Sequence, residues 1–408
     1  MPTRSPSSNQ PAADPARVRT ASRSLVAVDA AARTAALQAM ADELDAHAAA
    51  ILDANAADLA DARGAGTTAA LLDRLMLDRD RLAGVVAAVR EVAGLPDPVG
   101  ERVEGRELDN GLQLRKVRVP FGVVAVVYEA RPNVTADAAA IAVRTGNGIL
   151  LRGSTAARRT NAAMVDALRA GLVASGLDAD AIMLYDPLDK DGFRELIATE
   201  GSVDLLIPRG GEGLKRFLLE HARVPVLAAA GGNCHVYVDA SADPAMAERI
   251  LLNAKTQRTG VCNAAETLLV HRDHAHGLLE RLTRSLDAAG VRIHEDEEGW
   301  QTEYLDMDIG LRVVDSLEAA IDHVNRYGTG HSEAIITDDE AAAERFGREV
   351  DAACIYHNAS TRFTDGGVFG MGAEVGISTN KLHVRGPIGP RELMTTRWLV
   401  RGSGQVRG

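Results

Sequence analysis

The chain has 408 residues, of which 46% are hydrophobic, 25% charged and 3% aromatic, and its formal net charge is −12. This composition is ordinary for a globular protein, and the length corresponds to about two or three domains. The negative charge argues against proteins that bind nucleic acid through a basic stripe, and against attraction to anionic membrane surfaces.

The first 22 residues are rich in Pro, Ser and Ala and lack the apolar core of a secretory signal. We expect residues 1–22 to form a disordered tail. No apolar run approaches the ~20 residues that a membrane span needs. The three cysteines, Cys234, Cys262 and Cys354, are widely spaced, which argues against a disulfide framework. We therefore expect a reducing, cytoplasmic location.

Helical periodicity dominates the next part of the chain. In residues 25–92, apolar side chains recur at three- and four-residue steps, which predicts a helical hairpin or bundle. Residues 106–119 alternate apolar and polar side chains around Asn110 and Gly111. This dipeptide predicts a β-hairpin with a two-residue turn in which both residues adopt positive φ. The β-like C-terminal stretch 397–407 is predicted to pair with the hairpin.

After residue 120 short apolar strands alternate with helices, which is typical of a parallel sheet covered on both faces. The alternation continues beyond Cys262 and indicates a second α/β unit. The expected strands are 122–128, 148–152, 181–185, 203–207, 224–228, 266–270, 311–314, 334–337 and 352–357. The expected helices are 136–145, 155–175, 275–289, 316–327 and 339–349.

Cys262 lies between a helix-like run and an apolar strand, with the small residues Gly260 and Ala264 nearby. Most free cysteines are small buried hydrophobes, and this is our interpretation of Cys234 and Cys354. A nucleophilic thiolate needs an approachable position with help from backbone N–H groups or a nearby cation. The loop around Cys262 is suited to that role.

Two strand-to-helix junctions are candidate binding sites. Gly210 and Gly211 sit where a helix N-terminus favours an anion, although their spacing fits neither a dinucleotide fingerprint nor a Walker A motif, and a purely structural turn is equally consistent. Asn133 is either a helix cap, for which Thr135 is an equally good candidate, or a donor to an oxyanion. Arg131 adds a cation at the same junction.

Three later segments are rich in polar residues or glycine. The His-rich stretch 271–276 has no cysteine or carboxylate partner at ligand spacing, so we expect no metal site. His331 and Ser332 come just before a strand and are consistent with a polar turn. The glycine-rich segment 362–379 predicts a close approach of backbone to a ligand or partner.

Several segments, in this order, resemble the gamma-glutamyl phosphate reductases (glutamate-5-semialdehyde dehydrogenases) of the aldehyde dehydrogenase superfamily. They are "VPFGVVAVVYEARPNVTADA", "LLIPRGGEGL", "GGNCHVYVD", "NAKTQRTGVCNAAETLLVH", "HVNRYGTGHSEAIIT" and "NASTRFTDGGVFGMGAEVGISTNKLHVRGP". The resemblance implies an aldehyde-dehydrogenase-like α/β fold, with a Rossmann-type cofactor domain, an α/β catalytic domain and a β-hairpin oligomerisation arm. The implied domains are a tail (1–22), an NADP-binding domain (23–104 and 124–237), a catalytic domain with the nucleophilic cysteine (238–375), and an arm with the C-terminal segment (105–123 and 376–408).

The resemblance also implies roles for matching residues. Cys262 corresponds to the superfamily nucleophile, and Asn133 with the Cys262 backbone N–H corresponds to the oxyanion hole. Gly210 and Gly211 fall where relatives seat the dinucleotide pyrophosphate. Arg152 falls where relatives place a cation against the adenosine ribose, and it is expected to favour NADPH over NADH.

The remaining implied contacts concern the nicotinamide ribose and the substrate. Glu303 falls where relatives hold the nicotinamide ribose. Arg362, a lone cation in a Ser-, Thr- and Gly-rich loop, is expected to bind the substrate's phosphate or carboxylate. Arg131, His331 and Ser332 are further candidate substrate contacts.

The implied activity is reduction of L-glutamyl 5-phosphate to L-glutamate 5-semialdehyde through a cysteine thioester, with NADPH as cofactor, in proline biosynthesis. The implied partners are further copies of the chain and, functionally, glutamate 5-kinase. Two alternatives remain open: a hydrolytic NAD(P)-dependent aldehyde dehydrogenase, and a non-catalytic binding protein on the same scaffold. The turn 226–233 contains no acid, unlike that of hydrolytic relatives. The segment formed by residues 293–303 is shorter than the family pattern predicts, so we expect a helix or strand of the second domain to be shortened there.

Overall fold

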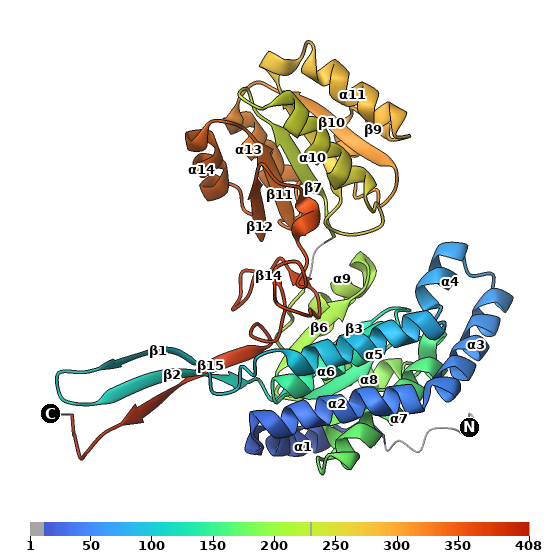
Figure 1. The fold of residues 1–408 in the computed structure, drawn as a ribbon, viewed down its shortest axis with the longest axis vertical. Coiled ribbons are helices and arrows are strands. Elements are labelled where there is room, and N and C mark those ends of the chain that lie inside the picture. The colour runs from blue at the N-terminus through green and yellow to red at the C-terminus, as the bar shows by residue number, and fades with distance from the viewer. Residues whose placement is uncertain (1–11, 229–230, 408) are drawn as a thin grey trace. The chain divides into compact units, whose positions relative to one another are not determined.

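The computed structural model describes residues 12–228 and 231–407, which divide into two compact units (Figure 1). Unit 1 comprises Met1–Leu227, Met371–Gly376 and Ile388–Gly408. Unit 2 comprises Ala228–Gly370 and Ile377–Pro387. The chain therefore leaves unit 1 after residue 227, returns to it for residues 371–376, leaves it again for residues 377–387 and ends in it.

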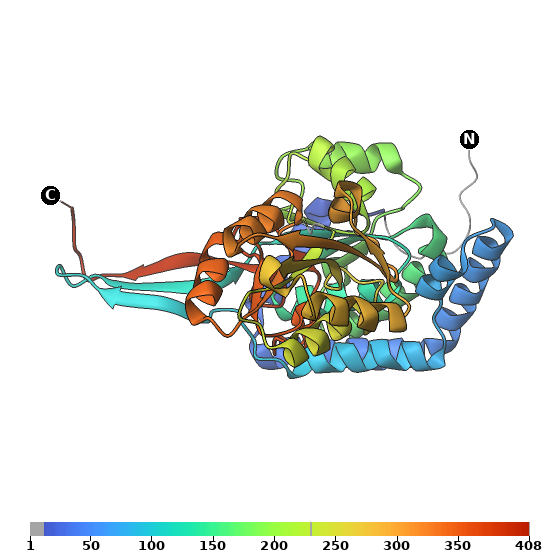
Figure 2. The ribbon, with the colours of Figure 1, turned by 90° about the horizontal axis from the view of Figure 1, so that it is seen from above.

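Unit 1 begins with the predicted helical region, which the structure confirms. Helices α2 and α5 run side by side (Figure 2), and α2 also packs on the later helix α7. Aspartate side chains accept hydrogen bonds from the first turns of α1, α2 and α5, as is typical of N-caps. None of the helices in the described residues is both long and apolar enough to cross a membrane. The helices are α1 (Pro15–Ala27), α2 (Ala30–Ala46), α3 (Ala48–Gly64), α4 (Ala69–Leu75) and α5 (Arg79–Gly94).

The predicted disordered tail differs from the structure in its last part. Residues 1–11 lie outside the described residues, but α1 begins at Pro15 after the cap Asp14. Val18 and Leu25 are fully buried on one face of this helix. The prediction was wrong for residues 15–22. The apolar residues that form the buried face of α1 are few, and the Arg, Ser and Ala residues between them obscure the helical spacing.

A four-stranded parallel sheet with the order β5-β4-β3-β6 forms the centre of unit 1. Every residue of β3 is buried, as expected for a strand covered on both faces. Val123, Ala125 and Val127 face one side, where they cluster with Phe193 and Ile197 of α8. The strands are β3 (Val123–Tyr128), β4 (Gly148–Arg152), β5 (Ile182–Leu184) and β6 (Leu205–Arg209). The helices between and after them are α6 (Asn133–Arg144), α7 (Arg158–Ala174), α8 (Lys190–Ala198) and α9 (Glu212–His221), with short 3-10 turns at Thr155–Ala157 and Ala179–Ala181.

The strand predicted at 224–228 is not formed. Val226 makes a single bridge to Leu206, and the Leu206 N–H donates to the Pro225 carbonyl oxygen (2.8 Å). Pro225 has no N–H to donate, so a continuous ladder cannot extend through it. The prediction of a strand was therefore wrong, and the apolar run lies beside β6 as irregular chain.

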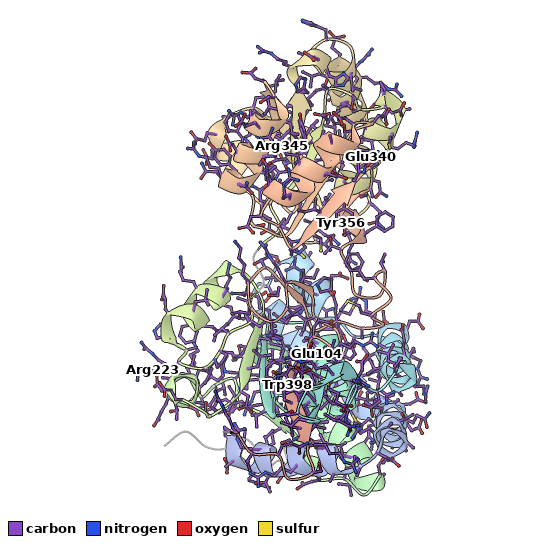
Figure 3. All side chains as sticks on the ribbon, turned by 90° about the vertical axis from the view of Figure 1, so that its left-hand side faces the viewer. Glu104, Arg223, Glu340, Arg345, Tyr356 and Trp398 are labelled. Atoms are coloured by element: carbon purple, nitrogen blue, oxygen red, sulfur yellow. The ribbon has the colours of Figure 1, made fainter. Side chains whose placement is uncertain are left out.

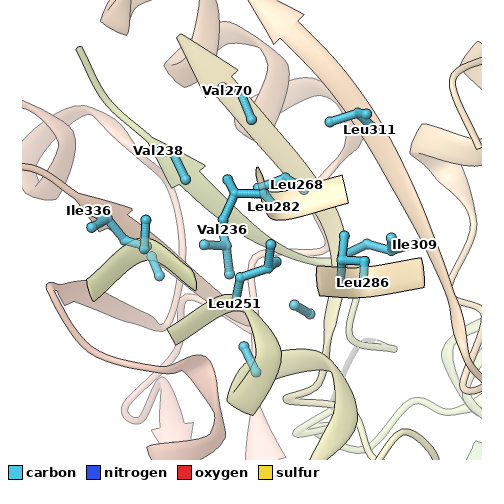
Figure 4. Packing of buried hydrophobic residues seen from close by; sticks show 14 of the residues in the cluster. Val236, Val238, Leu251, Leu268, Val270, Leu282, Leu286, Ile309, Leu311 and Ile336 are labelled. Atoms are coloured by element: carbon cyan, nitrogen blue, oxygen red, sulfur yellow. The ribbon is translucent and has the colours of Figure 1, made fainter. Parts of the chain in front are cut away.

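Unit 2 is a second three-layer α/β arrangement, with a six-stranded parallel sheet of order β12-β11-β7-β8-β10-β9. Helices α10 and α11 cover one face, where Leu251 and Leu282 pack on Val236, Leu268 and neighbouring strand residues (Figure 4). Helices α13 and α14 cover the other face. The strands are β7 (Cys234–Val238), β8 (Ala265–His271), β9 (Arg292–His294), β10 (Asp308–Val314), β11 (Ser332–Ile336) and β12 (Cys354–His357), with a small β13–β14 pair (Ile377–Ser378 and Gly386–Pro387). The helices are α10 (Pro244–Thr256), α11 (Leu278–Ala288), α12 (Glu297–Gln301), α13 (Leu317–Tyr327) and α14 (Glu340–Glu349), with 3-10 turns at Arg272–His274 and Thr361–Phe363. The span 293–303 therefore holds most of β9 and the whole of α12, both short.

The predicted hairpin and its pairing with the C-terminal stretch are confirmed. Strands β1 (Arg102–Glu107), β2 (Gln113–Pro120) and β15 (Met394–Arg401) form an antiparallel sheet that projects from unit 1 as an arm (Figure 1). On this arm Lys116 pairs with Glu104 (3.2 Å) and lies 5.5 Å from the centre of the Trp398 ring (Figure 3). One side chain of the central strand thus contacts both neighbours.

The turn of the hairpin differs from the prediction. Of the two turn residues only Gly111 has a positive φ, of 84°. The Gly111 N–H donates to the Leu108 carbonyl oxygen, and the Leu108 N–H donates to the Leu112 carbonyl oxygen (both 2.8 Å). The loop is therefore three residues long, with glycine in the left-handed position, which is the next most common hairpin connection.

Candidate active site

Cys262 lies in unit 2, in the loop between α10 and β8, as predicted. Its side chain is half-buried. The loop is tightened by two backbone hydrogen bonds, from Val261 N–H to the Thr259 carbonyl oxygen (2.9 Å) and from Ala264 N–H to the Val261 carbonyl oxygen (3.1 Å). The thiol is therefore presented from a short turn of small residues.

The carbonyl of Cys262 is fixed from the start of β7. The buried Cys234 thiol donates to the Cys262 carbonyl oxygen (3.2 Å). Burial raises the pKa of the Cys234 thiol, so this group remains a protonated donor. A Cβ at Gly232 would overlap the same carbonyl oxygen, so this position requires glycine. Cys234 thus supports the loop, in agreement with the prediction of a structural role.

The residue after the cysteine is fastened to the turn Thr361–Phe363. The Asn263 amide donates to the carbonyl oxygen of Thr364 (2.8 Å), and the Thr361 hydroxyl donates to the Asn263 carbonyl oxygen (2.7 Å). Thr361 is fully buried and Asn263 almost so. The turn that carries Arg362 is therefore held at a fixed place beside the cysteine loop.

Arg362, a predicted substrate residue of unit 2, lies within electrostatic range of Cys262. Its Nε donates to the Gln257 side-chain oxygen (2.8 Å). Burial lowers the pKa of Arg362, the positive charge of Arg258 adds to this effect, and Cys262 acts in the opposite direction. Two guanidinium groups thus lie within electrostatic range of each other, and one of them within range of the thiol.

His331 and Ser332 lie at the start of β11 and are fully buried. The His331 Nδ1 is 2.8 Å from the Ser332 hydroxyl, which is 2.6 Å from the hydroxyl of Thr364, and Tyr356 also reaches Thr364 (2.6 Å). Burial lowers the pKa of His331 to about 4. In contrast to the expectation, neither predicted residue is exposed to a substrate; both brace the segment after Arg362.

Glu303 follows α12 and is half-buried. Its Oε1 accepts a hydrogen bond from the Gly232 N–H (2.6 Å), and a Cβ at Gly231 would overlap its Oε2. Asn233, next in the chain, donates to the carbonyl oxygens of Trp300 (2.8 Å) and Tyr327 (2.9 Å). The segment around α12 therefore fixes residues 231–233, which lead into β7. The start of β7 in turn supports the cysteine loop.

In unit 1, Asn133 is the first residue of α6 and its side chain is exposed. It does not cap the helix; its Nδ2 donates to the Asp137 carboxylate (3.1 Å). Thr135, the other candidate cap, is buried and donates to the Asn161 side chain (3.1 Å). Burial raises the pKa of Asp137 to about 6, while the hydrogen bond from Asn133 and the charge of Arg209 act in the opposite direction. The amide is thus oriented by a neighbour four residues on and is free of a capping role.

Gly210 and Gly211 connect β6 to α9, as predicted. The Gly211 N–H donates to Oε1 of Glu129 (2.8 Å), and a Cβ at Gly210 would lie 2.8 Å from the same oxygen. An acidic oxygen therefore occupies the N-terminus of the ten-residue helix. The site accepts negative charge, and glycine allows its close approach.

Arg152 ends β4 in unit 1, with Arg131 in the turn between β3 and α6. The Arg152 guanidinium lies 4.4 Å from the centre of the Phe193 ring and donates to the Pro187 carbonyl oxygen (3.1 Å). Burial lowers its pKa. Arg131 is half-buried, and its carbonyl oxygen accepts the Val134 N–H (3.1 Å).

No group of three or more His, Cys, Asp or Glu residues that could hold a metal ion occurs within residues 12–228 and 231–407. In the His-rich segment, His274 Nε2 instead lies 2.9 Å from the Asp239 carbonyl oxygen. This histidine connects the segment to the end of β7.

Sequence analysis missed three residues that organise the site. Asp137 orients the Asn133 amide, and Lys255 forms an ion pair with Glu266 (2.7 Å) in which both side chains are fully buried. Lys255 closely follows the apolar run 250–252 and Glu266 closely precedes the apolar run 268–270, on either side of the cysteine. A charged residue close to an apolar run was the available signal at each of these two positions.

Comparisons with known proteins place these features in a family context. The model of the aldehyde dehydrogenase family matches residues 6–302. A gamma-glutamyl phosphate reductase from Thermotoga maritima is 41% identical, with a TM-score of 0.95 over 97% of this chain and 99% of that chain. One from Saccharomyces cerevisiae is 31% identical, with a TM-score of 0.55 over 97% and 98%. An engineered glycolyl-CoA reductase with bound NADP+ is 14% identical, with a TM-score of 0.70 over 97% and 98%, and shares the fold.

Proposed function

The chain belongs to the gamma-glutamyl phosphate reductases of the aldehyde dehydrogenase family, and we propose that it uses NADPH to reduce L-glutamyl 5-phosphate to L-glutamate 5-semialdehyde, a step of proline biosynthesis. The observation that carries the mechanism is the placement of Cys262. Its half-buried thiol stands in a turn braced from β7 and beside the cation of Arg362.

Cys262 acts as the nucleophile in the first step. Its thiolate attacks the acyl carbon of the substrate, so that a carbon–sulfur bond forms and the carbonyl oxygen becomes an oxyanion. The oxyanion then collapses, and phosphate leaves with the electron pair of the carbon–oxygen bond. The product of this step is a thioester on Cys262.

Asn133 supplies a donor to the oxyanion in this proposal, together with the Cys262 backbone N–H. One hydrogen of the Asn133 amide is used on Asp137, which leaves the second for the substrate. Because Asp137 already orients the amide, little reorganisation is needed when charge develops on the substrate oxygen.

Arg362 and Arg258 are the proposed partners of the leaving phosphate or of the substrate carboxylate. Two neighbouring guanidinium groups repel each other, and an anion between them relieves that repulsion. Gln257 accepts a hydrogen bond from Nε of Arg362, and this bond orients the other two nitrogens of the guanidinium group. Arg362→Ala is expected to raise KM for the acyl substrate more than it lowers kcat, and an unchanged KM would argue against this role.

The residues of unit 1 fit an anionic dinucleotide. The N-terminus of α9 already holds an acidic oxygen, that of Glu129, at the Gly211 N–H, which supports a pyrophosphate at the same place once Glu129 moves aside. Arg152 would contact the adenosine ribose and its 2′-phosphate. When bound, NADPH supplies the hydride that reduces the thioester carbon. Arg152→Ala should reduce the preference for NADPH over NADH, and an unaltered preference would refute this assignment.

A hydrolytic aldehyde dehydrogenase is less consistent with these residues. Hydrolysis of a thioester needs a carboxylate to activate water. The turn 226–233 has no acid, Glu303 accepts a hydrogen bond from Gly232, and Glu266 is paired with Lys255. Neither Glu303 nor Glu266 is thus placed in this proposal to activate water against the thioester.

The cellular setting is a further part of the proposal. We expect the protein to act in the cytoplasm as a homo-oligomer, with the arm as the contact between copies, and in functional association with glutamate 5-kinase. The proposal for the arm is supported by its projection from unit 1 and by exposed apolar side chains on β15.

The test is an assay of purified protein in the oxidative direction, with glutamate 5-semialdehyde, phosphate and NADP+, followed by absorbance of the reduced nicotinamide. The proposal predicts that turnover requires phosphate or arsenate. Turnover at the same rate without either anion would establish hydrolysis instead, and full turnover by Cys262→Ala would favour a non-catalytic thiol.

A further inference from the structure

The buried ion pair between Lys255 and Glu266 has no part in the reaction proposed above. Lys255 lies near the end of α10 and Glu266 is the second residue of β8, so the pair brackets the loop of Cys262. Both side chains are fully buried, and their charged atoms are 2.7 Å apart. Because desolvation offsets much of the attraction in such a pair, stability alone is a weak reason for it.

The second carboxylate oxygen of Glu266 accepts a hydrogen bond from a strained turn. Its Oε1 accepts a hydrogen bond from the Leu305 N–H (3.2 Å). Leu305 has a φ of 55°, in the left-handed region, which is strained for a residue with a Cβ. Burial raises the pKa of Glu266 to about 7, and the charge and hydrogen bond of Lys255 oppose that shift. Lys255 therefore helps Glu266 to remain an acceptor for the turn.

The turn carries Glu303, two residues before Leu305. The Glu303 carboxylate accepts the Gly232 N–H (2.6 Å), and Gly232 packs against the Cys262 carbonyl. The contacts thus run without a break from the ion pair through the strained turn to the support of the cysteine loop.

We infer that Lys255 and Glu266 are positioning residues for the nicotinamide end of the cofactor: they hold the turn at Leu305 so that the Glu303 carboxylate stays in place against Gly232 and is presented to the nicotinamide ribose. The inference rests on the proposed function for the identity of the dinucleotide. It adds two residues, neither of which touches the reacting atoms, whose effect passes through Glu303.

The first test is NADPH binding to Glu266→Gln, measured by titration of NADPH fluorescence without any substrate. Glutamine has one acceptor oxygen and one NH₂ group, so it cannot accept from both Lys255 and Leu305. We expect NADPH to bind at least fivefold more weakly, with the thermal unfolding temperature little changed. The control is Glu248→Gln, also in unit 2, which removes a charge from the exposed pair with Arg281 and should leave NADPH binding unaltered.

A double-mutant cycle separates positioning from general destabilisation. If Glu266 acts through Glu303, Glu266→Gln should weaken NADPH binding in the wild type but not further in a Glu303→Gln background. Leu305→Gly provides a rescue, because glycine adopts the left-handed conformation without strain and Leu305 is 40% exposed. Added to Glu266→Gln, it should restore part of the lost affinity.

The outcomes distinguish this inference from the proposed function. NADPH binding within twofold of wild type in a folded Glu266→Gln variant, or full additivity with Glu303→Gln, would overturn the positioning role. If Glu266→Gln does not fold, Lys255→Met paired with Glu266→Leu, which removes both buried charges, takes its place in the same titration with the same criterion. Wild-type protein that binds NADPH but fails to turn over glutamate 5-semialdehyde would refute the proposed substrate alone.

Discussion

At the scale of single residues, the function depends on how neighbours orient a few polar groups. Asn133 is a helix-start residue by sequence, yet its amide is directed by Asp137, one helical turn later. Cys262 is similarly set by Cys234 and Gly232, neither of which has a role of its own in the reaction. If Asn133 and Cys262 have the proposed roles of donor and nucleophile, these contacts orient both groups before substrate binds.

Asn133→Ala is expected to lower kcat about 10²–10³-fold, with a smaller effect on KM, because an oxyanion donor acts mainly on the transition state. The measurement is steady-state kinetics in the direction of semialdehyde oxidation with saturating phosphate. The control is Asn161→Ala, which removes a buried side-chain amide from the same unit but leaves the proposed oxyanion donor, Asn133, in place. Equal kcat for Asn133→Ala and wild type would remove Asn133 from the site.

Asp137 gives a pH dependence with a defined sign. Its pKa is raised from 3.8 to about 6, so the folded state holds this proton more tightly than the unfolded state. Its contribution to stability is therefore favourable at low pH and is lost as the pH rises from about 4 to about 6. In thermal unfolding, the difference between wild type and Asp137→Asn should change in that direction across this window. A difference that is constant with pH would contradict the assignment.

At the scale of elements, close packing of helices in unit 1 decides where glycine is needed. Gly171 of α7 faces α2, where an added Cβ would lie 2.5 Å from the Met40 backbone. Gly84, inside α5, has no atom within 4 Å of the corresponding position. Gly171 thus allows α7 to pack closely on α2, whereas Gly84 only lowers the stability of α5.

Gly171→Ala is expected to destabilise the protein by about 1–3 kcal/mol through overpacking, because backbone atoms cannot move aside easily. Gly84→Ala should instead stabilise it by about 0.5–1 kcal/mol, since alanine is the better helix former. Chemical denaturation of both variants checks the pair. Shifts of the same sign would show that the α2–α7 contact is less tight than described.

Much of the element pattern could be predicted from the sequence, because period and turn residues are local signals. Most strands of both sheets and several of their helices followed from apolar runs, and Asn110-Gly111 identified the hairpin. The strand at 224–228 was not formed because Pro225 cannot donate to a ladder, and the α1 stripe was too short to stand out.

The candidate site was only partly predictable. Cys262 was indicated by its small neighbours, and Arg362 by its loop. Asp137 and the pair Lys255–Glu266 were missed because their partners are identified by the folded chain and not by spacing. His331 and Ser332 were expected to form a polar turn or to contact substrate, but both are buried, and the Ser332 hydroxyl is hydrogen-bonded to that of Thr364.

At the scale of the whole molecule, the arm offers an unpaired strand edge. In the part of the chain that the structure describes, β15 pairs with β2 on one side and has no strand on the other. Its exposed side chains include Trp398 (44% exposed) and Val400 (58% exposed). Exposed edges of this kind pair readily with another chain.

Removal of residues 397–408, which deletes most of β15, is therefore expected to reduce the oligomeric state. Removal of residues 402–408 alone, which leaves β15 intact, should not. Sedimentation velocity of the two truncated proteins beside the full chain measures the difference. Identical sedimentation of both would exclude β15 from the contact between copies.

The central claim is that the Cys262 sulfur carries the acyl group during turnover. Protein treated with L-glutamyl 5-phosphate in the absence of NADPH and then digested should yield the peptide containing Cys262 with the mass of a glutamyl thioester, and Cys354 should remain unmodified. The adduct should disappear when NADPH is added. Persistent absence of the adduct from Cys262 in protein that turns over would contradict the account.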